Sequence, residues 1–236
     1  MIKLYQFHTA LGLPNLSPFC LKVEAFLRLA GLPYEIVWTP NPGKGPLGKL
    51  PFIRDGETIV ADSSAIVEHL KRAYGVTLDA QLTPPQRALA TAFRRLLEEH
   101  LYWALIYARW VQDEGFARIA PVFFAPLPAP LRGLVARIAR RQTLRAAHGH
   151  GLSRHAPEEV WRRAGEDIDA LAAQLGDQPF FLGSEPTSID ASVYAFVANC
   201  WQVQMDTPLK ALVARHPNLT AYCMRMSGRC FAPARG

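Results

Sequence analysis

The spacing of hydrophobic and polar residues changes about a third of the way along this chain. Before residue 76, short apolar runs rich in β-branched and aromatic residues alternate with two longer segments in which apolar residues recur at helical spacing. The runs predict strands and the longer segments predict helices, an alternation typical of a small α/β unit. Strands are predicted at residues 2–7, 34–38, 51–54 and 58–61, and helices at residues 18–30 and 62–74.

Two local signals indicate how this unit is closed. Asp55-Gly56-Glu57 lies between two β-prone runs and predicts a hairpin turn, and Gly75 supplies a stop for the second helix. Strand, helix and strand, followed by a hairpin and a helix, is the order of a thioredoxin-like domain, which we expect to span residues 1–76. Residues 77–85 are predicted to be a linker, which ends in two consecutive prolines.

Beyond residue 86 the strand signals stop and long helical patterns replace them. Helices are predicted at residues 86–112, 131–147, 157–175 and 187–200, with a proline-rich break over residues 121–130. No internal repeat is visible. Residues 86–236 therefore predict an all-helical second domain, so the fold class is an α/β domain followed by an all-α domain.

The composition is that of a globular protein without covalent or metal support. Half of the 236 residues are hydrophobic and 19% are charged, and a chain of this length can bury a substantial core. The four cysteines include no C-x-x-C pair and no histidine at ligand spacing, so no metal site is predicted. Reduced cysteines, together with the lack of any apolar run of signal-peptide or membrane-spanning type, predict a cytoplasmic protein without a transmembrane segment.

The positive charge is modest but unevenly distributed. The formal net charge is +6, and six arginines crowd residues 132–154. Such a cluster could attract phosphates or anionic lipid. A basic helix face is most often simply solvated, so we expect no nucleic-acid partner.

The first candidate catalytic residue lies between the first predicted strand and the first predicted helix. Ser17 is followed by Pro18, a pair that caps a helix and opens its first turn. Main-chain N–H groups and the helix dipole converge on such a residue, so an anion such as a thiolate is favoured beside the hydroxyl. Taken alone, the pair is more often a plain helix cap.

Two further motifs point to the binding of a short peptide. Pro51 opens a strand directly after a loop, where a cis Leu50-Pro51 bond would turn the main-chain N–H and C=O of Leu50 outward to pair with an extended ligand. Asp62 and Ser63 begin a helix, and a carboxylate beside a hydroxyl can hold the ammonium and carboxylate of one amino acid. Each motif also has an ordinary interpretation, as a trans proline at a strand start and as a routine helix cap.

Together and in this order, the three motifs resemble the glutathione transferase superfamily. The segments over residues 14–24 and 99–103 are similar to the metaxin and failed-axon-connections branch, and the resemblance covers nearly the whole chain. It implies the glutathione transferase fold, glutathione as co-substrate, a homodimer, and Ser17 as the catalytic residue that activates the thiol. The glutathione-binding residues that it implies are Lys44, Lys49, Leu50, Pro51, Asp62 and Ser63.

The second substrate is expected on the first long helix of the helical domain. His100, Trp103, Tyr107 and Trp110 share one face of that helix, a stripe that is more often core than pocket. In the family this helix borders the cleft between the domains, so the resemblance implies an apolar pocket there. Trp103 and Tyr107 are the expected pocket residues, because their polar tips suit a partly wet cleft.

The predicted function is conjugation of the glutathione thiolate to a small apolar electrophile. Two alternatives stay open. One is a non-catalytic adaptor similar to the metaxins, which would bind proteins or membrane surfaces through the helical domain. The other is a glutathione-dependent thiol-disulfide transferase that uses Cys20, although a packing cysteine is the more usual interpretation of that position.

Overall fold

The N-terminal part of the chain folds around a four-stranded sheet. The computed structural model describes residues 1–232. Its strands are β1 (Ile2–Gln6), β2 (Tyr34–Trp38), β3 (Phe52–Asp55) and β4 (Thr58–Ala61). They lie in the order β2-β1-β3-β4, with β1 parallel to β2 and antiparallel to β3, and β3 antiparallel to β4. The predicted thioredoxin-like order is confirmed, with each strand end within one residue of its expected place.

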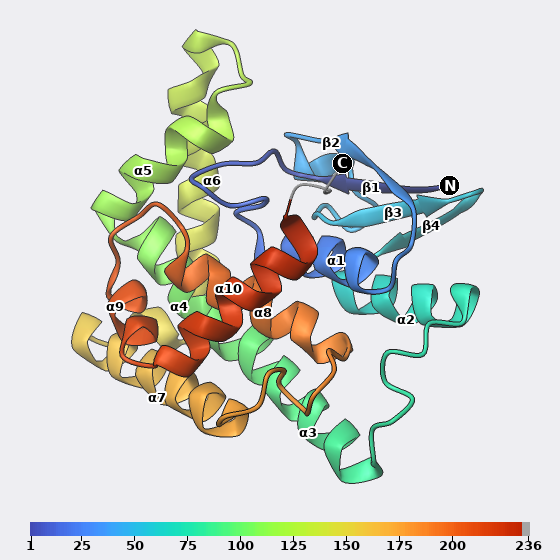
Figure 1. Ribbon diagram of the computed structural model, residues 1–236. Coiled ribbons are helices and arrows are strands. Elements are labelled where there is room, and N and C mark those ends of the chain that lie inside the picture. The colour runs from blue at the N-terminus through green and yellow to red at the C-terminus, as the bar shows by residue number, and fades with distance from the viewer. Residues whose placement is uncertain (233–236) are drawn as a thin grey trace.

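Two helices cover one face of this sheet (Figure 1). They are α1 (Pro18–Leu29) and α2 (Ser63–Tyr74), close to the predicted bounds. Ile2 and Leu4 of β1 belong to the buried core that also holds apolar side chains of α1 and α2. Gly75 ends α2 in the left-handed conformation, with φ of 62°. Between β2 and β3 the chain makes only a short 3-10 turn, η1 (Pro42–Lys44).

The rest of the described chain is helical and surrounds one central helix. That helix, α8 (Ser188–Trp201), is buried from Ile189 to Cys200 because it is apolar on nearly every side. It packs against α1, which joins the two parts of the molecule into one core. The other elements are α3 (Pro84–Arg95), η2 (Leu96–Leu101), α4 (Tyr102–Ile106), η3 (Tyr107–Val111), α5 (Asp113–Phe124), α6 (Ala129–His150), η4 (Leu152–Arg154), α7 (Pro157–Leu175), α9 (Pro208–Ala214) and α10 (Pro217–Phe231).

The first long helix of this part differs from the predicted regular helix. Residues 84–111 are helical throughout, but η2 and η3 are π-helical turns, which close i→i+5 hydrogen bonds and take in an extra residue. Each π-helical turn contains a buried charged residue, Glu98 in η2 and Arg109 in η3. Such turns are frequent at functional sites, and these two face the N-terminal part of the molecule, as described below.

The predicted proline-rich break is present but shorter than residues 121–130, because it spans only residues 125–128. Helix α5 continues through Pro121 to Phe124, and α6 already begins at Ala129. Pro121 lies in the last turn of α5 and its side chain is exposed, so the loss of one main-chain hydrogen bond does not end the helix there. Among residues 1–232, α6 included, no helix is both long enough and apolar enough to cross a membrane.

Candidate functional site

The three predicted motifs meet at one edge of the sheet. The pairing of Tyr5 with Phe52, and of Phe52 with Ala61, places the end of β1, the start of β3 and the end of β4 side by side. Cys20 of α1 packs with Leu50 and Phe52 in one apolar cluster that Ala61 also contacts. Ser17, the Leu50-Pro51 bond and Asp62 therefore come from three loops that lead to a common edge.

Ser17 caps α1 as predicted, and its hydroxyl can still donate to a ligand stronger than a neutral thiol. Its Oγ accepts a hydrogen bond from the N–H of Cys20 at 3.3 Å, and its own N–H donates to Asn15 Oδ1 at 2.9 Å. Within residues 1–232 the Cys20 thiol, a weak acceptor, is the one acceptor beside the hydroxyl, and the N–H of Phe19 in the first turn has no partner. Two donors at the positive end of a helix are thus available to an anion.

The loop that precedes Ser17 is held in place by both parts of the molecule. The buried Asn15 side chain donates to the carbonyl of Phe7 at 2.7 Å. Leu11 adopts a left-handed φ of 48° in a tight turn, and its carbonyl accepts the N–H of Gln204 at 2.9 Å. Because Leu13 and Leu16 are also buried, the loop fixes the position of Ser17.

The Leu50-Pro51 bond is cis, as predicted. The N–H and C=O of Leu50 make no hydrogen bond within residues 1–232, so this stretch of main chain can pair with an extended ligand. The loop before it is tight, because a Cβ atom on Gly45 would lie 2.2 Å from the carbonyl oxygen of Lys49. Lys44 and Lys49 are exposed on this loop and form no ion pair with the described residues.

Asp62 holds a backbone conformation that is unusual for its residue type. Its φ of 77° is costly for a residue other than glycine, and such strain collects at binding sites. Its Oδ1 caps α2 by accepting the N–H groups of Ser64 at 2.9 Å and Ala65 at 3.0 Å. Its Oδ2 has no hydrogen bond within residues 1–232, which leaves one carboxylate oxygen for a ligand.

A buried ion pair that the sequence did not reveal lies behind Ser63. Nζ of Lys22, a side chain only 2% exposed, is 2.6 Å from Glu98 Oε1 and also donates to the hydroxyls of Ser63 at 3.2 Å and Ser64 at 2.9 Å. Arg94 completes the group by donating to Ser64 and Glu98. Burial lowers the pKa of Lys22, and the neighbouring Glu98 opposes that change. The sequence signal for this buried pair was a lysine inside the apolar run of α1.

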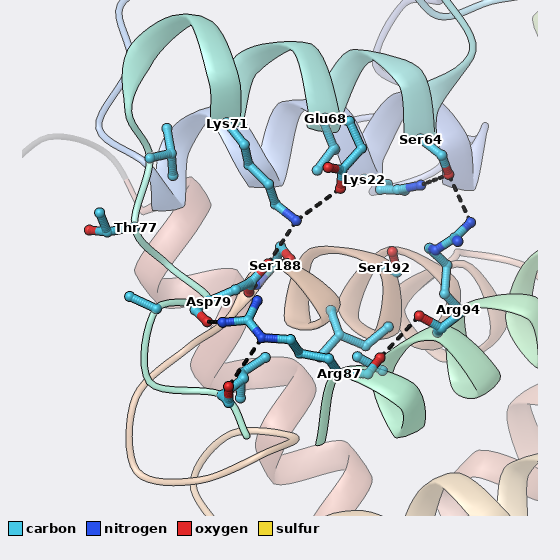
Figure 2. A pocket seen from close by; sticks show the side chains of 17 residues that line it. Lys22, Ser64, Glu68, Lys71, Thr77, Asp79, Arg87, Arg94, Ser188 and Ser192 are labelled. Carbon is cyan, nitrogen blue, oxygen red and sulfur yellow. Dashed lines mark hydrogen bonds and ion pairs between the residues drawn. The ribbon is translucent and has the colours of Figure 1, made fainter. Parts of the chain in front are cut away.

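This ion pair borders a cavity of about 480 Å³ between the two parts of the molecule. Figure 2 shows Lys22, Ser64 and Arg94 at one side of the cavity, and Lys71 and Asp79 at the other. Asp79, from the predicted linker, accepts Lys71 Nζ at 2.7 Å and the N–H of Ser188 at 2.8 Å. Ser17, Leu50 and Asp62 do not line this cavity, so it is separate from the edge where the motifs meet.

The structure packs Trp103 and Tyr107 against other helices of the second part of the molecule. Trp103 stacks on His150 of α6 with ring centroids 4.6 Å apart, and Tyr107 packs edge-on against Trp161 of α7 at 5.3 Å. Tyr107 is only 5% exposed. The predicted face therefore packs within the helical part, and it is Tyr102 that contacts α1, through Phe19 at 4.9 Å.

An apolar surface nearer to Ser17 comes from α5 instead. Phe7, which follows β1, packs edge-on against Phe123 at 5.4 Å, and Trp110 lies 5.9 Å from Phe123. Phe7 is tied to the Ser17 loop through Asn15. Sequence analysis missed Phe123 because it assigned residues 121–130 to a break.

Arg109 is a second buried charge close to Ser17. It is 6% exposed, and it donates to the carbonyl of Leu16 at 2.7 Å and to Asn199 at 2.8 and 2.9 Å. No carboxylate within residues 1–232 lies within 4.0 Å of its guanidinium. Burial lowers the pKa of Arg109 to about 10. An unpaired cation thus binds the carbonyl of the residue that precedes Ser17.

Cys20 is fully buried beneath the site. Burial raises the pKa of its thiol to about 12, against the opposing hydrogen bonds from Ser17 and from the Phe7 N–H. The thiol is therefore neutral near pH 7, which is the opposite of what a nucleophilic cysteine needs. Within residues 1–232, no three side chains of the metal-binding types gather into a cation site.

Comparison with known proteins identifies the family. The family model "Glutathione S-transferase N-terminal domain" matches residues 18–115, and "Glutathione S-transferase, C-terminal domain" matches residues 164–226. The isoprene-epoxide glutathione S-transferase of Rhodococcus sp. (strain AD45) is 38% identical over 96% of this chain and 98% of its own length. The chain belongs to the glutathione transferase superfamily.

Two further relatives place it in the branch expected from the sequence. Failed axon connections of Drosophila melanogaster is 33% identical over 98% of this chain and 58% of its own length. Metaxin-1 of Mus musculus is 32% identical over 90% of this chain and 69% of its own length. Among solved structures, a glutathione S-transferase of Ceriporiopsis subvermispora in complex with glutathione superposes with a TM-score of 0.68, at 18% identity, over 99% of both chains. The glutathione transferase fold and the metaxin-like branch are thereby confirmed.

Proposed function

We propose that this chain binds glutathione at the sheet edge and joins its thiolate sulfur to a small apolar electrophile. The observation that carries the proposal is that three groups able to bind a ligand meet at one edge: the Ser17 hydroxyl, the main chain of Leu50 and Asp62 Oδ2. The 38% identical isoprene-epoxide glutathione S-transferase supports an electrophile of that class.

Each group suits one part of the tripeptide. The main chain of Leu50 pairs with the extended backbone of glutathione, next to Pro51. Asp62 Oδ2 accepts the ammonium of the γ-glutamyl residue, while Ser63, whose Oγ already accepts from Lys22, donates its proton to the adjacent carboxylate. Lys44 and Lys49 lie on the exposed loop beside Leu50, where they favour the terminal carboxylate.

The transfer needs a thiolate beside Ser17. The hydroxyl donates to the sulfur, the first turn of α1 adds the Phe19 N–H, and Arg109 adds positive potential from behind. The thiolate then attacks an epoxide carbon, a C–S bond forms, the C–O bond breaks, and the released alkoxide takes a proton from water. We place the electrophile against Phe7 and Phe123, in place of Trp103 and Tyr107.

Asp62 gives the most direct test of glutathione binding. Asp62→Ala should weaken glutathione binding by about 1.5 to 3 kcal/mol, the usual magnitude for a charge-assisted contact. Asp62→Asn keeps a helix-capping oxygen but removes the charge, so it should lose affinity while α2 stays capped. Calorimetric titration with glutathione measures both variants, and unchanged affinity in both would place the tripeptide elsewhere.

Arg109 should contribute to thiolate formation through its charge. Arg109→Met is expected to raise the pKa of the bound thiol by roughly one unit, whereas Arg109→Lys retains most of the effect. Asn199→Ala serves as the matched control, because it removes a partner of the same guanidinium and keeps the charge. Thiolate absorbance measured against pH at saturating glutathione separates the variants, and equal shifts in all three would assign Arg109 a purely structural role.

The two alternatives make different predictions about glutathione. An adaptor similar to the metaxins would not be retained on immobilised glutathione, whereas the proposed enzyme is retained and elutes with the free tripeptide. A thiol-disulfide transferase would lose all activity as Cys20→Ala, and the burial of Cys20 argues against that outcome. A homodimer and a cytoplasmic location remain expectations that follow from the resemblance and from the cysteine content.

A further inference from the structure

Helices α5 and α6 form a hairpin that projects past the rest of the molecule (Figure 1). On the N-terminal half of α6, Leu131, Leu134 and Ile138 are 48%, 55% and 49% exposed. They recur at i, i+3 and i+7, so they form one apolar row along the helix. Contiguous exposed apolar side chains mark an interaction surface, whereas single ones are ordinary.

A row of arginines runs beside this apolar row. Arg137, Arg141 and Arg145 recur at i, i+4 and i+8, and none of them makes a side-chain hydrogen bond or ion pair within residues 1–232. Arg140, on another face of α6, instead binds the carbonyl of Trp110 at 2.9 Å. No aspartate or glutamate occurs from residue 115 to residue 157. The hairpin surface is therefore both apolar and cationic, without acidic residues of its own.

We propose that the α5–α6 hairpin docks this protein on a membrane surface that contains anionic lipid. The row of Leu131, Leu134 and Ile138 enters the boundary of the acyl chains, and the arginine row binds lipid phosphates. Helices that lie in a membrane interface combine these two features, an apolar row and a basic flank. Each arginine near an anionic surface strengthens binding roughly fivefold, and the effect weakens as salt screens it. This docking goes beyond the proposed transfer reaction and does not depend on it.

A second copy of the chain fits this surface poorly. Parallel, in-register pairing of two α6 helices would put arginine against arginine, and antiparallel pairing centred on Ile138 would put Leu131 against Arg145. Contact with an acidic face elsewhere on another copy would be heterologous, so it would propagate into chains rather than close into a dimer. A nucleic acid would bind the arginines but leave the apolar row in water.

A fluorophore placed on the apolar row tests insertion directly. The four cysteines are all buried, so the new thiol of Leu134→Cys can be labelled selectively with an environment-sensitive dye. Vesicles of phosphatidylcholine with phosphatidylserine should raise and blue-shift its emission, whereas pure phosphatidylcholine should have little effect. Met224→Cys, at a position on α10 that is 58% exposed, is the matched control and should not respond. Equal responses at both positions, or none at Leu134→Cys, would overturn the proposal.

Vesicle sedimentation tests the two rows separately. Leu134→Ser with Ile138→Ser, and Arg137→Gln with Arg141→Gln, should each lower the partition coefficient roughly tenfold or more. Met224→Ser with Arg72→Gln should leave it unchanged, and circular dichroism checks that every variant is folded.

Two other occupants of the surface would change the emission of the dye on Leu134→Cys in different ways. Emission that rises with protein concentration in the absence of vesicles would assign the surface to a second copy. A response to a short DNA duplex that equals the vesicle response would assign it to nucleic acid, and either result would overturn membrane docking.

Discussion

Replacing Ser17 by alanine should slow conjugation by about ten- to a hundredfold with little change in glutathione affinity, because the hydroxyl acts on the charged form of the sulfur. A free thiol of pKa about 8.5 is only a few per cent ionised near pH 7, and a fall of roughly two units makes most of it reactive. That fall corresponds to about 2.7 kcal/mol of differential stabilisation of the thiolate. The Ser17 hydroxyl, beside which the weakly accepting Cys20 thiol is the one acceptor within residues 1–232, is placed to supply a large part of it.

The rate deficit of Ser17→Ala should depend on pH. The site lowers the thiol pKa, so the thiolate is present above the lowered pKa and is lost as the pH falls through it. In Ser17→Ala the pKa rises, so the rate deficit should be largest near pH 7 and shrink toward pH 9, where the free thiol ionises without help. Thiolate absorbance and turnover measured across this range should move together.

Two further variants separate the hydroxyl from the helix cap. Ser17→Thr keeps a hydroxyl and a capping oxygen, so it should retain most of the activity. Ser17→Cys should form a mixed disulfide by exchange with glutathione disulfide, which releases one glutathione thiolate, because a cysteine at the start of α1 has a lowered pKa. If Ser17→Ala left both absorbance and turnover unchanged, Ser17 would be a helix cap alone, and the Phe19 N–H and Arg109 would remain as the groups that stabilise the thiolate.

The features that the sequence predicted correctly are local ones. The cap at Ser17, the turn at Asp55-Gly56-Glu57 and the helix stop at Gly75 depend on residues a few positions apart, and each is present in the structure. The cis bond at Pro51 followed from the resemblance to a family with that feature. The edge where the motifs meet could be expected for the same reason, because their order along the chain matches the order of strands and helices.

The features that the sequence did not predict depend on contacts between distant residues. Lys22 meets Glu98 across 76 positions, and Arg109 meets Leu16 across 93. Neither pairing has a local signature, and a charge in an apolar run shows only that a partner is needed. The packing of the aromatic face has a different cause. The aromatic face was assigned at 3.6 residues per turn, whereas the π-helical turns η2 and η3 add residues and rotate the face, so Tyr107 lies against Trp161.

Breaking the Lys22–Glu98 pair should be among the most destabilising single changes in the N-terminal part. Lys22→Met leaves Glu98 buried, and removal of one partner from a buried pair typically costs about 3 to 5 kcal/mol of unfolding free energy. Arg94 still reaches Glu98 at 3.2 Å, so the lower end of that range is expected. Ser63 loses its donor in the same variant, so glutathione affinity should fall as well.

A double-mutant cycle distinguishes the charge pair from simple packing. Lys22→Met with Glu98→Leu removes both charges and should recover most of the lost stability, since a well-packed apolar pair often replaces a buried ion pair without loss. Glutathione affinity should not recover with it, because Ser63 still lacks its donor from Lys22.

An exposed ion pair on the same helix as Glu98 provides the control. Arg95 and Glu99 are 3.3 Å apart with side chains 60% and 65% exposed, so Arg95→Met should change stability by less than about 1 kcal/mol. Urea denaturation followed by circular dichroism measures each corner of the cycle, and calorimetry measures the affinity of each variant for glutathione. A cost for Lys22→Met no larger than for Arg95→Met would show that the pair does not hold the two parts of the molecule together. Recovery of affinity in the double variant would instead show that Ser63 is positioned without Lys22.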